Sequence, residues 1–135
     1  MSQESNLQWG RFLVAEDDET LRRLTVRILK SVAIEVVGVG DGEQALQCLI
    51  KADPPFDLVI TDVMMPKMDG LALLQAIRKN EGTAHTPVII LTAKNDPREV
   101  VAGINSGATQ YLIKPFKQQG LLDTVSLVLN RRRST

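Results

Sequence analysis

The sequence has little that would tie it to a membrane, an oxidising compartment or a polyanion. Cys48 is the single cysteine, so no internal disulfide can form and nothing indicates an oxidising compartment. No run approaches the roughly 20 apolar residues of a transmembrane helix, and the polar start lacks the basic-then-apolar order of a signal peptide. Lys and Arg number 16, as do Asp and Glu, so the formal net charge is zero. We therefore expect a cytoplasmic protein without membrane insertion and without direct nucleic-acid contact, because nucleic-acid binders neutralise many phosphates.

Length and composition fit a single globular domain. The chain has 135 residues, of which 44% are apolar and 24% charged. A domain of this size buries roughly two thirds of its unfolded surface, which is enough for a core without disulfides or a structural metal. No internal repeat or low-complexity stretch is present, so the sequence predicts one compact domain.

Short apolar runs alternate with amphipathic segments along the whole chain. Strands are predicted at residues 12–15, 36–39, 58–61, 88–91 and 111–113. Helices are predicted at residues 21–29, 43–52, 71–79, 97–106 and 117–132. In the first two helices the predicted buried faces include Leu24 and Ile50. Five strands separated by five helices indicate an α/β fold, a doubly wound five-stranded parallel sheet with helices on both faces.

Chemically distinctive side chains follow the ends of four predicted strands. They are Glu16 and Asp17, Asp62, Thr92 and Ala93, and Lys114. Because ligands of such sheets bind at the carboxyl ends of the strands, we expect these side chains to converge. Three clustered carboxylates repel one another unless a cation compensates, and Mg²⁺ or Mn²⁺ is the hard divalent ion that oxygen ligands favour. Together with a hydroxyl and a lysine, such a site indicates phosphoryl transfer.

Four segments carry a resemblance to a known family. They are FLVAEDDE, DLVITDVMMPKMDG, PVIILTA and GATQYLIKPF, with Thr92 lying 30 and Lys114 lying 52 residues after Asp62. From Phe12 to Leu129 the chain resembles the receiver domain of two-component response regulators, especially the stand-alone, chemotaxis-regulator-like members. The resemblance implies a flavodoxin-like strand order, 2-1-3-4-5. It also implies a receiver domain at residues 11–130, between a flexible N-terminal segment at residues 1–10 and a basic C-terminal tail at residues 131–135.

The resemblance assigns the phosphoacceptor and the metal ligands. Asp62 corresponds to the aspartate that accepts a phosphoryl group from a histidine kinase or a histidine phosphotransfer protein. Asp17 corresponds to the direct metal ligand and Glu16 to its acidic companion, which acts through metal-bound water. Asp62 and the main-chain carbonyl of Met64 would complete the protein ligands.

Further residues would bind the phosphoryl group and transmit the signal. Lys114 would pair with the phosphoryl oxygens, and its peptide bond to Pro115 is expected to be cis. Thr92 and Tyr111 correspond to the switch pair, and the small Ala93 would keep the phosphoryl pocket open. The implied protein is a switch that catalyses its own phosphorylation and dephosphorylation without being a conventional enzyme. It would act as a monomer or weak dimer on an unknown protein target.

Other functions on a similar fold fit the residues less well. The segment 38–42 superficially resembles a dinucleotide-binding loop, but it follows the second strand, and Glu43 stands where the third glycine belongs. A hydrolase with an aspartate nucleophile usually has an acid two residues later, where this chain has Met64. Two alternatives stay open: a receiver fragment of a longer response regulator or hybrid kinase, and a binding module that works without phosphorylation.

Overall fold

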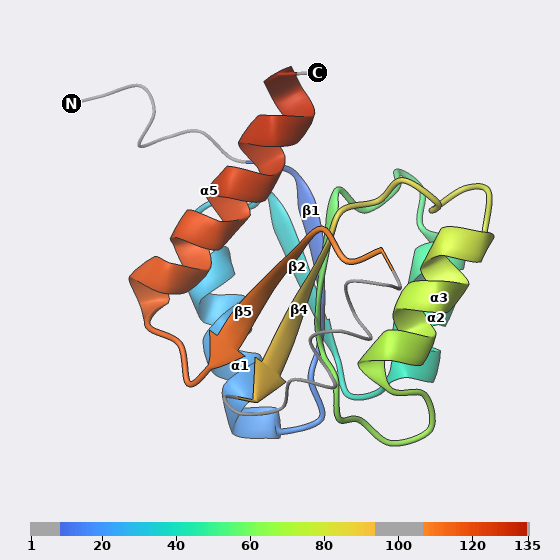
Figure 1. Ribbon diagram of the computed structural model, residues 1–135, viewed down its shortest axis with the longest axis horizontal. Helices are drawn as coiled ribbons and strands as arrows, with labels where there is room; N and C mark the ends of the chain where they lie inside the picture. The colour runs from blue at the N-terminus through green and yellow to red at the C-terminus, as the bar shows by residue number, and fades with distance from the viewer. Residues whose placement is uncertain (1–8, 94–106, 135) are drawn as a thin grey trace.

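Five parallel strands form the centre of the molecule. The structure is a computed structural model and describes residues 9–93 and 107–134. The strands are β1 (Arg11–Ala15), β2 (Glu35–Val39), β3 (Leu58–Asp62), β4 (Val88–Ala93) and β5 (Gln110–Lys114). They lie in the order β2-β1-β3-β4-β5, and every pairing is parallel (Figure 1). The predicted sheet and its strand order are thus confirmed.

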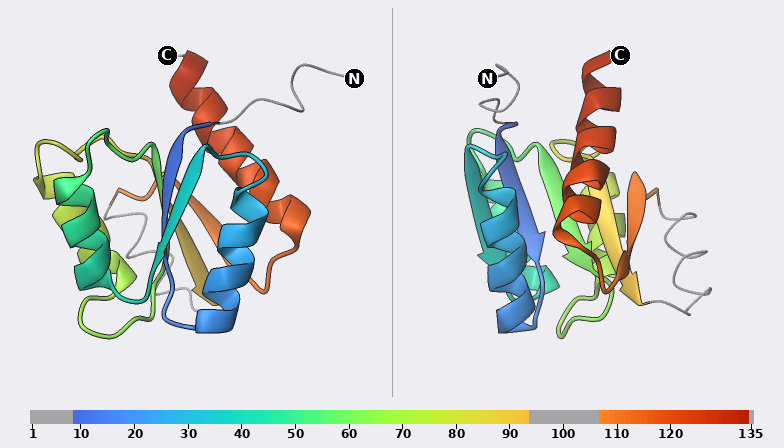
Figure 2. Two further views of the ribbon diagram at one scale, coloured as in Figure 1. Left: turned by 180° about the vertical axis from the view of Figure 1, so that it is seen from behind. Right: turned by 90° about the vertical axis from the view of Figure 1, so that its left-hand side faces the viewer.

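Helices cover both faces of the sheet. The described residues contain α1 (Glu19–Leu29), α2 (Gly42–Lys51), α3 (Gly70–Lys79) and α5 (Gln118–Ser134). Helices α1 and α5 lie on one face, and α2 and α3 lie on the other (Figures 1 and 2). The helix predicted at residues 97–106 and most of the N-terminal segment predicted to be flexible lie outside the described residues. Helix α5 continues to Ser134, so part of the segment predicted as a basic tail is helical.

Aspartates fix where three of the helices begin. Each accepts a hydrogen bond from the backbone N–H three residues later, which satisfies one of the free donors of the first helical turn. These N-caps are Asp18, Asp41 and Asp69. Asp18 is used as the N-cap of α1. Glu16 and Asp17, which lie between the end of β1 and this cap, remain available for a site.

Apolar side chains pack against both faces of the three central strands. Strands β1, β3 and β4 are almost entirely buried, as expected for strands covered on both sides. The predicted burial of Leu24 and Ile50 was wrong, since these side chains are 46% and 52% exposed. Each lies at the margin of its helix's apolar stripe, where the sheet no longer covers it.

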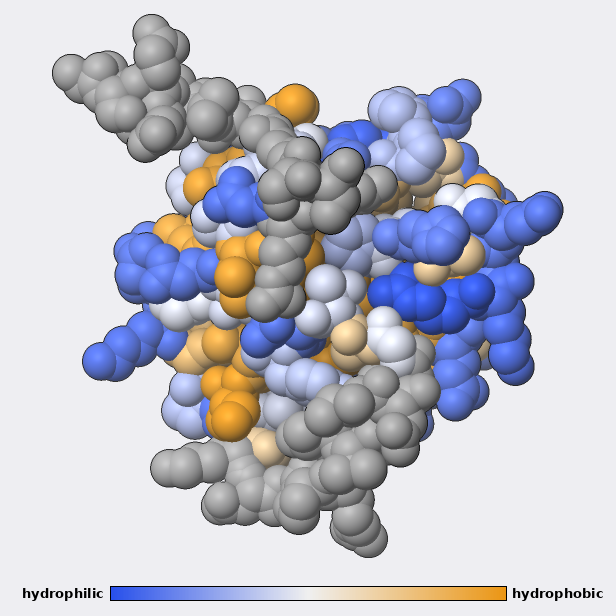
Figure 3. Space-filling model, turned by 45° about the horizontal axis from the view of Figure 1, so that its top comes forward, coloured by the Kyte–Doolittle hydropathy of each residue, from blue (hydrophilic) through white to orange (hydrophobic). Residues whose placement is uncertain are grey.

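The surface mixes polar and apolar residues. On the face drawn in Figure 3, the hydrophobic areas are broken up by hydrophilic ones. Within residues 9–93 and 107–134 we find no helix with the length and hydropathy of a membrane span.

Candidate phosphoryl-transfer site

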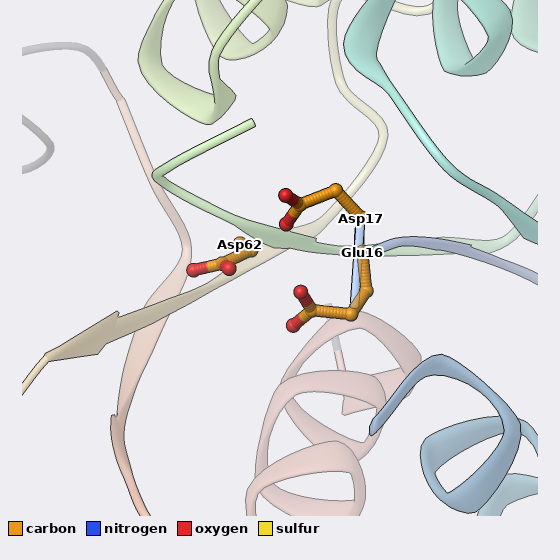
Figure 4. Close-up of side chains that lie close together, drawn as sticks. All are labelled: Glu16, Asp17 and Asp62. Atoms are coloured by element: carbon orange, nitrogen blue, oxygen red, sulfur yellow. The ribbon is translucent and has the colours of Figure 1, made fainter. Parts of the chain in front are cut away.

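Three carboxylates converge at the carboxyl end of the sheet. Glu16 and Asp17 follow β1, and Asp62 ends the adjacent strand β3. One oxygen atom from each carboxylate lies within 4.8 Å of the others, and Figure 4 shows the three side chains around a common space. Glu16 and Asp62 are buried, whereas Asp17 is exposed. The site therefore opens to solvent on the side of Asp17.

Lys114 brings a positive charge to this cluster from two strands away. Its Nζ lies 2.8 Å from Oδ2 of Asp62 and 3.1 Å from Oε1 of Glu16. The ammonium comes from β5 and reaches past β4, a distance of about two strand spacings of 4.8 Å each. Ala93 pairs with Lys114 in the β4–β5 register. A small residue at that position leaves room for the long lysine side chain.

Backbone groups orient the carboxylates. Oδ1 of Asp62 accepts a hydrogen bond of 2.8 Å from the N–H of Val63, so each oxygen of this carboxylate has a donor. Oε2 of Glu16 accepts one of 3.2 Å from the N–H of Asp18. The backbone carbonyl of Glu16 accepts a bond of 2.8 Å from Nη1 of Arg22. Two of the three carboxylates are thus held in place by the fold.

The electrostatics of the site call for a cation. Burial raises the pKa of Glu16 to about 7, and the nearby charge of Asp62 adds to this effect. Burial disfavours the charged form of Lys114, but its hydrogen bonds and charge interactions with Asp62 and Glu16 outweigh this and raise its pKa. Three carboxylates facing one ammonium leave an excess of negative charge. A hard divalent ion with oxygen ligands fits this donor set.

The predicted switch residues lie on β4, which pairs with β3, and on the edge strand β5 beyond it. Thr92 of β4 is fully buried, and Ala93 after it is exposed. Tyr111 of β5 is partly buried against the apolar cluster that covers the α2 and α3 face. Its hydroxyl is buried and has no hydrogen-bond partner in the described part of the chain. Burial raises the pKa of Tyr111.

Two further expectations concern Pro115 and Met64, which lie in the loops after β5 and β3. The Lys114–Pro115 peptide bond is cis, which confirms the prediction, and the Asp53–Pro54 bond is also cis, which the sequence did not indicate. Met64 lies in the loop after β3, and its side chain is 68% exposed.

Sequence reasoning gave no role to Gly70, which the structure places directly behind Asp62. A Cβ atom on Gly70 would lie 2.1 Å from the carbonyl oxygen of Asp62, so the helix α3 can approach β3 this closely only with glycine. The signal was present in the quoted motif, where the glycine follows the N-cap Asp69. The supporting N–H of Val63 is a backbone group that every residue except proline has, so the residue type at position 63 does not indicate this contact.

The sequence and the structure both have clear relatives. Residues 12–126 match the family described as the response regulator receiver domain. The chain is 37% identical to the "DNA-binding response regulator MtrA" of Mycobacterium tuberculosis, over 90% of this chain and 51% of that protein. It is 39% identical to the "Transcriptional regulatory protein CpxR" of Escherichia coli, over 90% of this chain and 50% of that protein. The chain spans about half the length of the curated relatives it matches.

Solved structures match over nearly their whole length. The chemotaxis response regulator CheY4 of Vibrio cholerae superposes with a TM-score of 0.82 at 33% identity, covering 90% of this chain and 99% of that one. The signal receiver domain of a histidine kinase from Syntrophus aciditrophicus gives 0.84 at 33% identity, covering 93% and 94%. Such domains are signalling proteins rather than conventional enzymes. With the family match, the fold and the acidic edge in agreement, this chain belongs to the response regulator receiver domains.

Proposed function

We propose that the chain is a signalling switch that accepts a phosphoryl group on Asp62. A carboxylate oxygen of Asp62 attacks the phosphorus atom of a phosphohistidine in a histidine kinase or histidine phosphotransfer protein. The P–N bond breaks, its electron pair stays on the imidazole, and an acyl phosphate forms on Asp62. The observation that carries the proposal is the placement of this buried carboxylate 2.8 Å from Nζ of Lys114 and beside two further carboxylates.

The surrounding residues would each do part of this work. Lys114 would move its ammonium from the carboxylate to the phosphoryl oxygens and offset their charge. The N–H of Val63 would keep the Asp62 side chain in its orientation during the attack. Glu16, Asp17, Asp62 and the main-chain carbonyl of Met64 would hold Mg²⁺ or Mn²⁺. When bound, the ion supplies neutralisation of the negative charge shared by carboxylates and phosphoryl group.

Thr92 and Tyr111 would convert the new charge into a change of shape. In the proposed switch the Thr92 hydroxyl turns toward the phosphoryl group, and the ring of Tyr111 moves inward. Hydrogen bonds to charged groups contribute about 1.5–3 kcal/mol each, so Thr92 and Lys114 together supply roughly 3–6 kcal/mol. Inverting a 1:99 population requires about 5.5 kcal/mol, so the bias is sufficient for a strong shift.

Output through a protein partner is the form that we propose for this chain. The names of its curated relatives describe DNA-binding and transcriptional regulators. The expectation of no direct nucleic-acid contact therefore does not extend to those longer proteins, and for this chain it stays a prediction. The cytoplasmic location and the monomeric or weakly dimeric state also stay predictions.

Labelling with a small phosphodonor tests the proposal. We expect acetyl phosphate to label the chain only when Mg²⁺ is present, and we expect Asp62→Asn to abolish the label. Asp123→Asn is the matched control, because this exposed α5 carboxylate accepts a hydrogen bond from Gln119 and belongs neither to the acidic cluster nor to the partners of Lys114. Equal labelling of the Asp62→Asn variant would refute Asp62 as acceptor. An unlabelled wild-type chain would favour the binding module that works without phosphorylation.

A further inference from the structure

A groove lined by positive charge lies between α1 and β2, outside the phosphoryl-transfer site. Figure 2 shows α1 alongside the edge strand β2. The groove has a volume of about 330 Å³ and is lined by Arg22, Arg23, Val26, Arg27, Lys30 and Gly38. Four of these six residues are cationic, and none is acidic. In a chain without net charge, this concentration of one sign is a local feature that needs an explanation.

The dipole of α1 accounts for only two of these four cations. Basic residues in the last turn of a helix interact favourably with its dipole, which accounts for Arg27 and Lys30. Arg22 and Arg23 lie in the N-terminal half of α1, where the dipole gives no such benefit. All four nevertheless line the same groove.

Few carboxylates compete for these charges. Arg23 forms an ion pair of 2.9 Å with Glu19, but both side chains are largely exposed, so the pair is weak. Arg22 donates to the carbonyl of Glu16, a neutral group that fixes the guanidinium without cancelling its charge. Within residues 9–93 and 107–134, no ion pair joins Arg22, Arg27 or Lys30 to an acid.

A glycine in the edge strand keeps the groove open. A Cβ atom on Gly38 would lie 3.1 Å from Cγ2 of Val26 and 3.3 Å from Cγ of Arg22, which is tighter than ordinary packing. Glycine weakens a strand, and its presence there often marks a place where another group approaches the backbone closely. Gly38 therefore forms the floor of the groove, and a larger side chain at this position would fill the groove.

We propose that this groove binds a small ligand that carries two or more linked phosphate groups, of the pyrophosphate or nucleoside polyphosphate class. One guanidinium group can donate two parallel hydrogen bonds to two oxygens of the same phosphate. The volume of the groove is in the range of small-ligand sites. The cations Arg22 and Lys30 lie on one line along α1 with the uncharged Val26 between them, about 12 Å apart at 1.5 Å per residue. That length suits linked phosphates better than one. An acidic protein segment fits less well, because stable protein interfaces cover about 800 Å² per partner.

Titration of the full chain with pyrophosphate, without Mg²⁺, tests the proposal. Amide signals in NMR spectra locate the ligand: we expect shifts at Arg27 and Gly38 and none at Thr92 or Ala93. Shifts confined to the latter pair would place the anion at the Lys114 site and overturn the proposal. So would the absence of any binding at millimolar pyrophosphate.

Two double variants distinguish specific binding in the groove from a general effect of the protein's net charge. Arg27→Gln with Lys30→Gln should weaken binding at least about tenfold, as expected for loss of two charged contacts. Lys51→Gln with Lys79→Gln removes the same charge from the last turns of α2 and α3 and should change the affinity less than about twofold. Equal weakening in both double variants would show that only net charge matters, which would refute the proposed groove.

A third variant tests the shape of the groove. Gly38→Val keeps every charge and fills the floor, so binding should be lost while the thermal melt stays cooperative. If this variant fails to fold, the two double variants still decide. Tighter binding of a Glu-rich peptide than of pyrophosphate at the same salt concentration would overturn the proposal in favour of an acidic protein partner.

Discussion

Lys114 is the residue on which the charge balance of the site depends. Its ammonium contacts both buried carboxylates, and its side chain is 24% exposed. We predict that Lys114→Gln slows phosphorylation by acetyl phosphate about 10- to 100-fold, since a hydrogen bond to a charged group contributes about 1.5–3 kcal/mol. Initial labelling rates measure this effect. Lys117→Gln, on an exposed lysine three residues later, should leave the rate unchanged, and an equal loss there would contradict the assigned role.

Two buried threonines differ in whether their hydroxyls have partners. Oγ1 of Thr25 is buried in α1 without a partner in the described part of the chain, whereas Oγ1 of Thr83 donates to the carbonyl of Ile77 at 2.8 Å. We predict that Thr25→Val raises the free energy of unfolding by about 1 kcal/mol, because an unsatisfied polar group is removed. Thr83→Val should lower it by about 1 kcal/mol. Urea unfolding of both variants checks the pair, and a loss of stability in Thr25→Val would contradict this reading.

At the scale of elements, two glycines in helices have opposite surroundings. A Cβ on Gly70 would collide with the backbone of Asp62, while one on Gly120 of α5 would meet nothing within 4 Å. We predict that Gly70→Ala lowers the free energy of unfolding by about 1–3 kcal/mol, because the α3–β3 contact must open. Gly120→Ala should raise it by about 0.5–1 kcal/mol through helix propensity.

The Gly70 variant also tests how closely the helix supports the site. Because the collision falls on the carbonyl of the proposed phosphoacceptor, Gly70→Ala should reduce labelling by acetyl phosphate even where the chain remains folded. Gly120→Ala should label like the wild-type chain. Full labelling of a folded but destabilised Gly70→Ala variant would show that the position of α3 does not matter to the chemistry.

The elements were largely predictable because their signals are local. Strands buried on both faces produce uninterrupted apolar runs, such as residues 58–61, and aspartate N-caps mark the helix starts. The exposure of Leu24 and Ile50 was not predictable, because burial at the margin of a helix depends on neighbours that are distant in sequence.

The residues of the site could be predicted from the sequence only because the order and direction of the strands could be inferred. Once the parallel topology was inferred, Asp17, Asp62 and Lys114 had to approach one edge, and their residue types indicated the chemistry. Contacts that involve the backbone were out of reach, including the N–H of Val63 and the approach of Gly70. Arg78 is a similar case: its guanidinium binds the carbonyls of Thr86 at 2.6 Å and Gly107 at 3.0 Å, and nothing local marks it.

For the molecule as a whole, zero net charge hides two opposite concentrations of charge. The carboxyl end of the sheet is acidic, and the groove beside α1 is basic. Because a cation bound only by the folded chain stabilises it, Mg²⁺ should raise the free energy of unfolding, by about 2.7 kcal/mol at 100 times its Kd. Asp17→Asn should remove most of this gain, and Asp123→Asn should keep it. Thermal melts with Mg²⁺ and with a chelator give the comparison; an equal gain in both variants would place the ion elsewhere.

The central claim is that Asp62 carries the phosphoryl group, and chemical trapping tests it most directly. Borohydride reduces an acyl phosphate on aspartate to homoserine, which mass spectrometry of the digested chain locates. After treatment with acetyl phosphate and Mg²⁺, we predict homoserine at position 62 and at no other aspartate. Homoserine at another position, or none in a chain that has bound phosphate covalently, would contradict the claim.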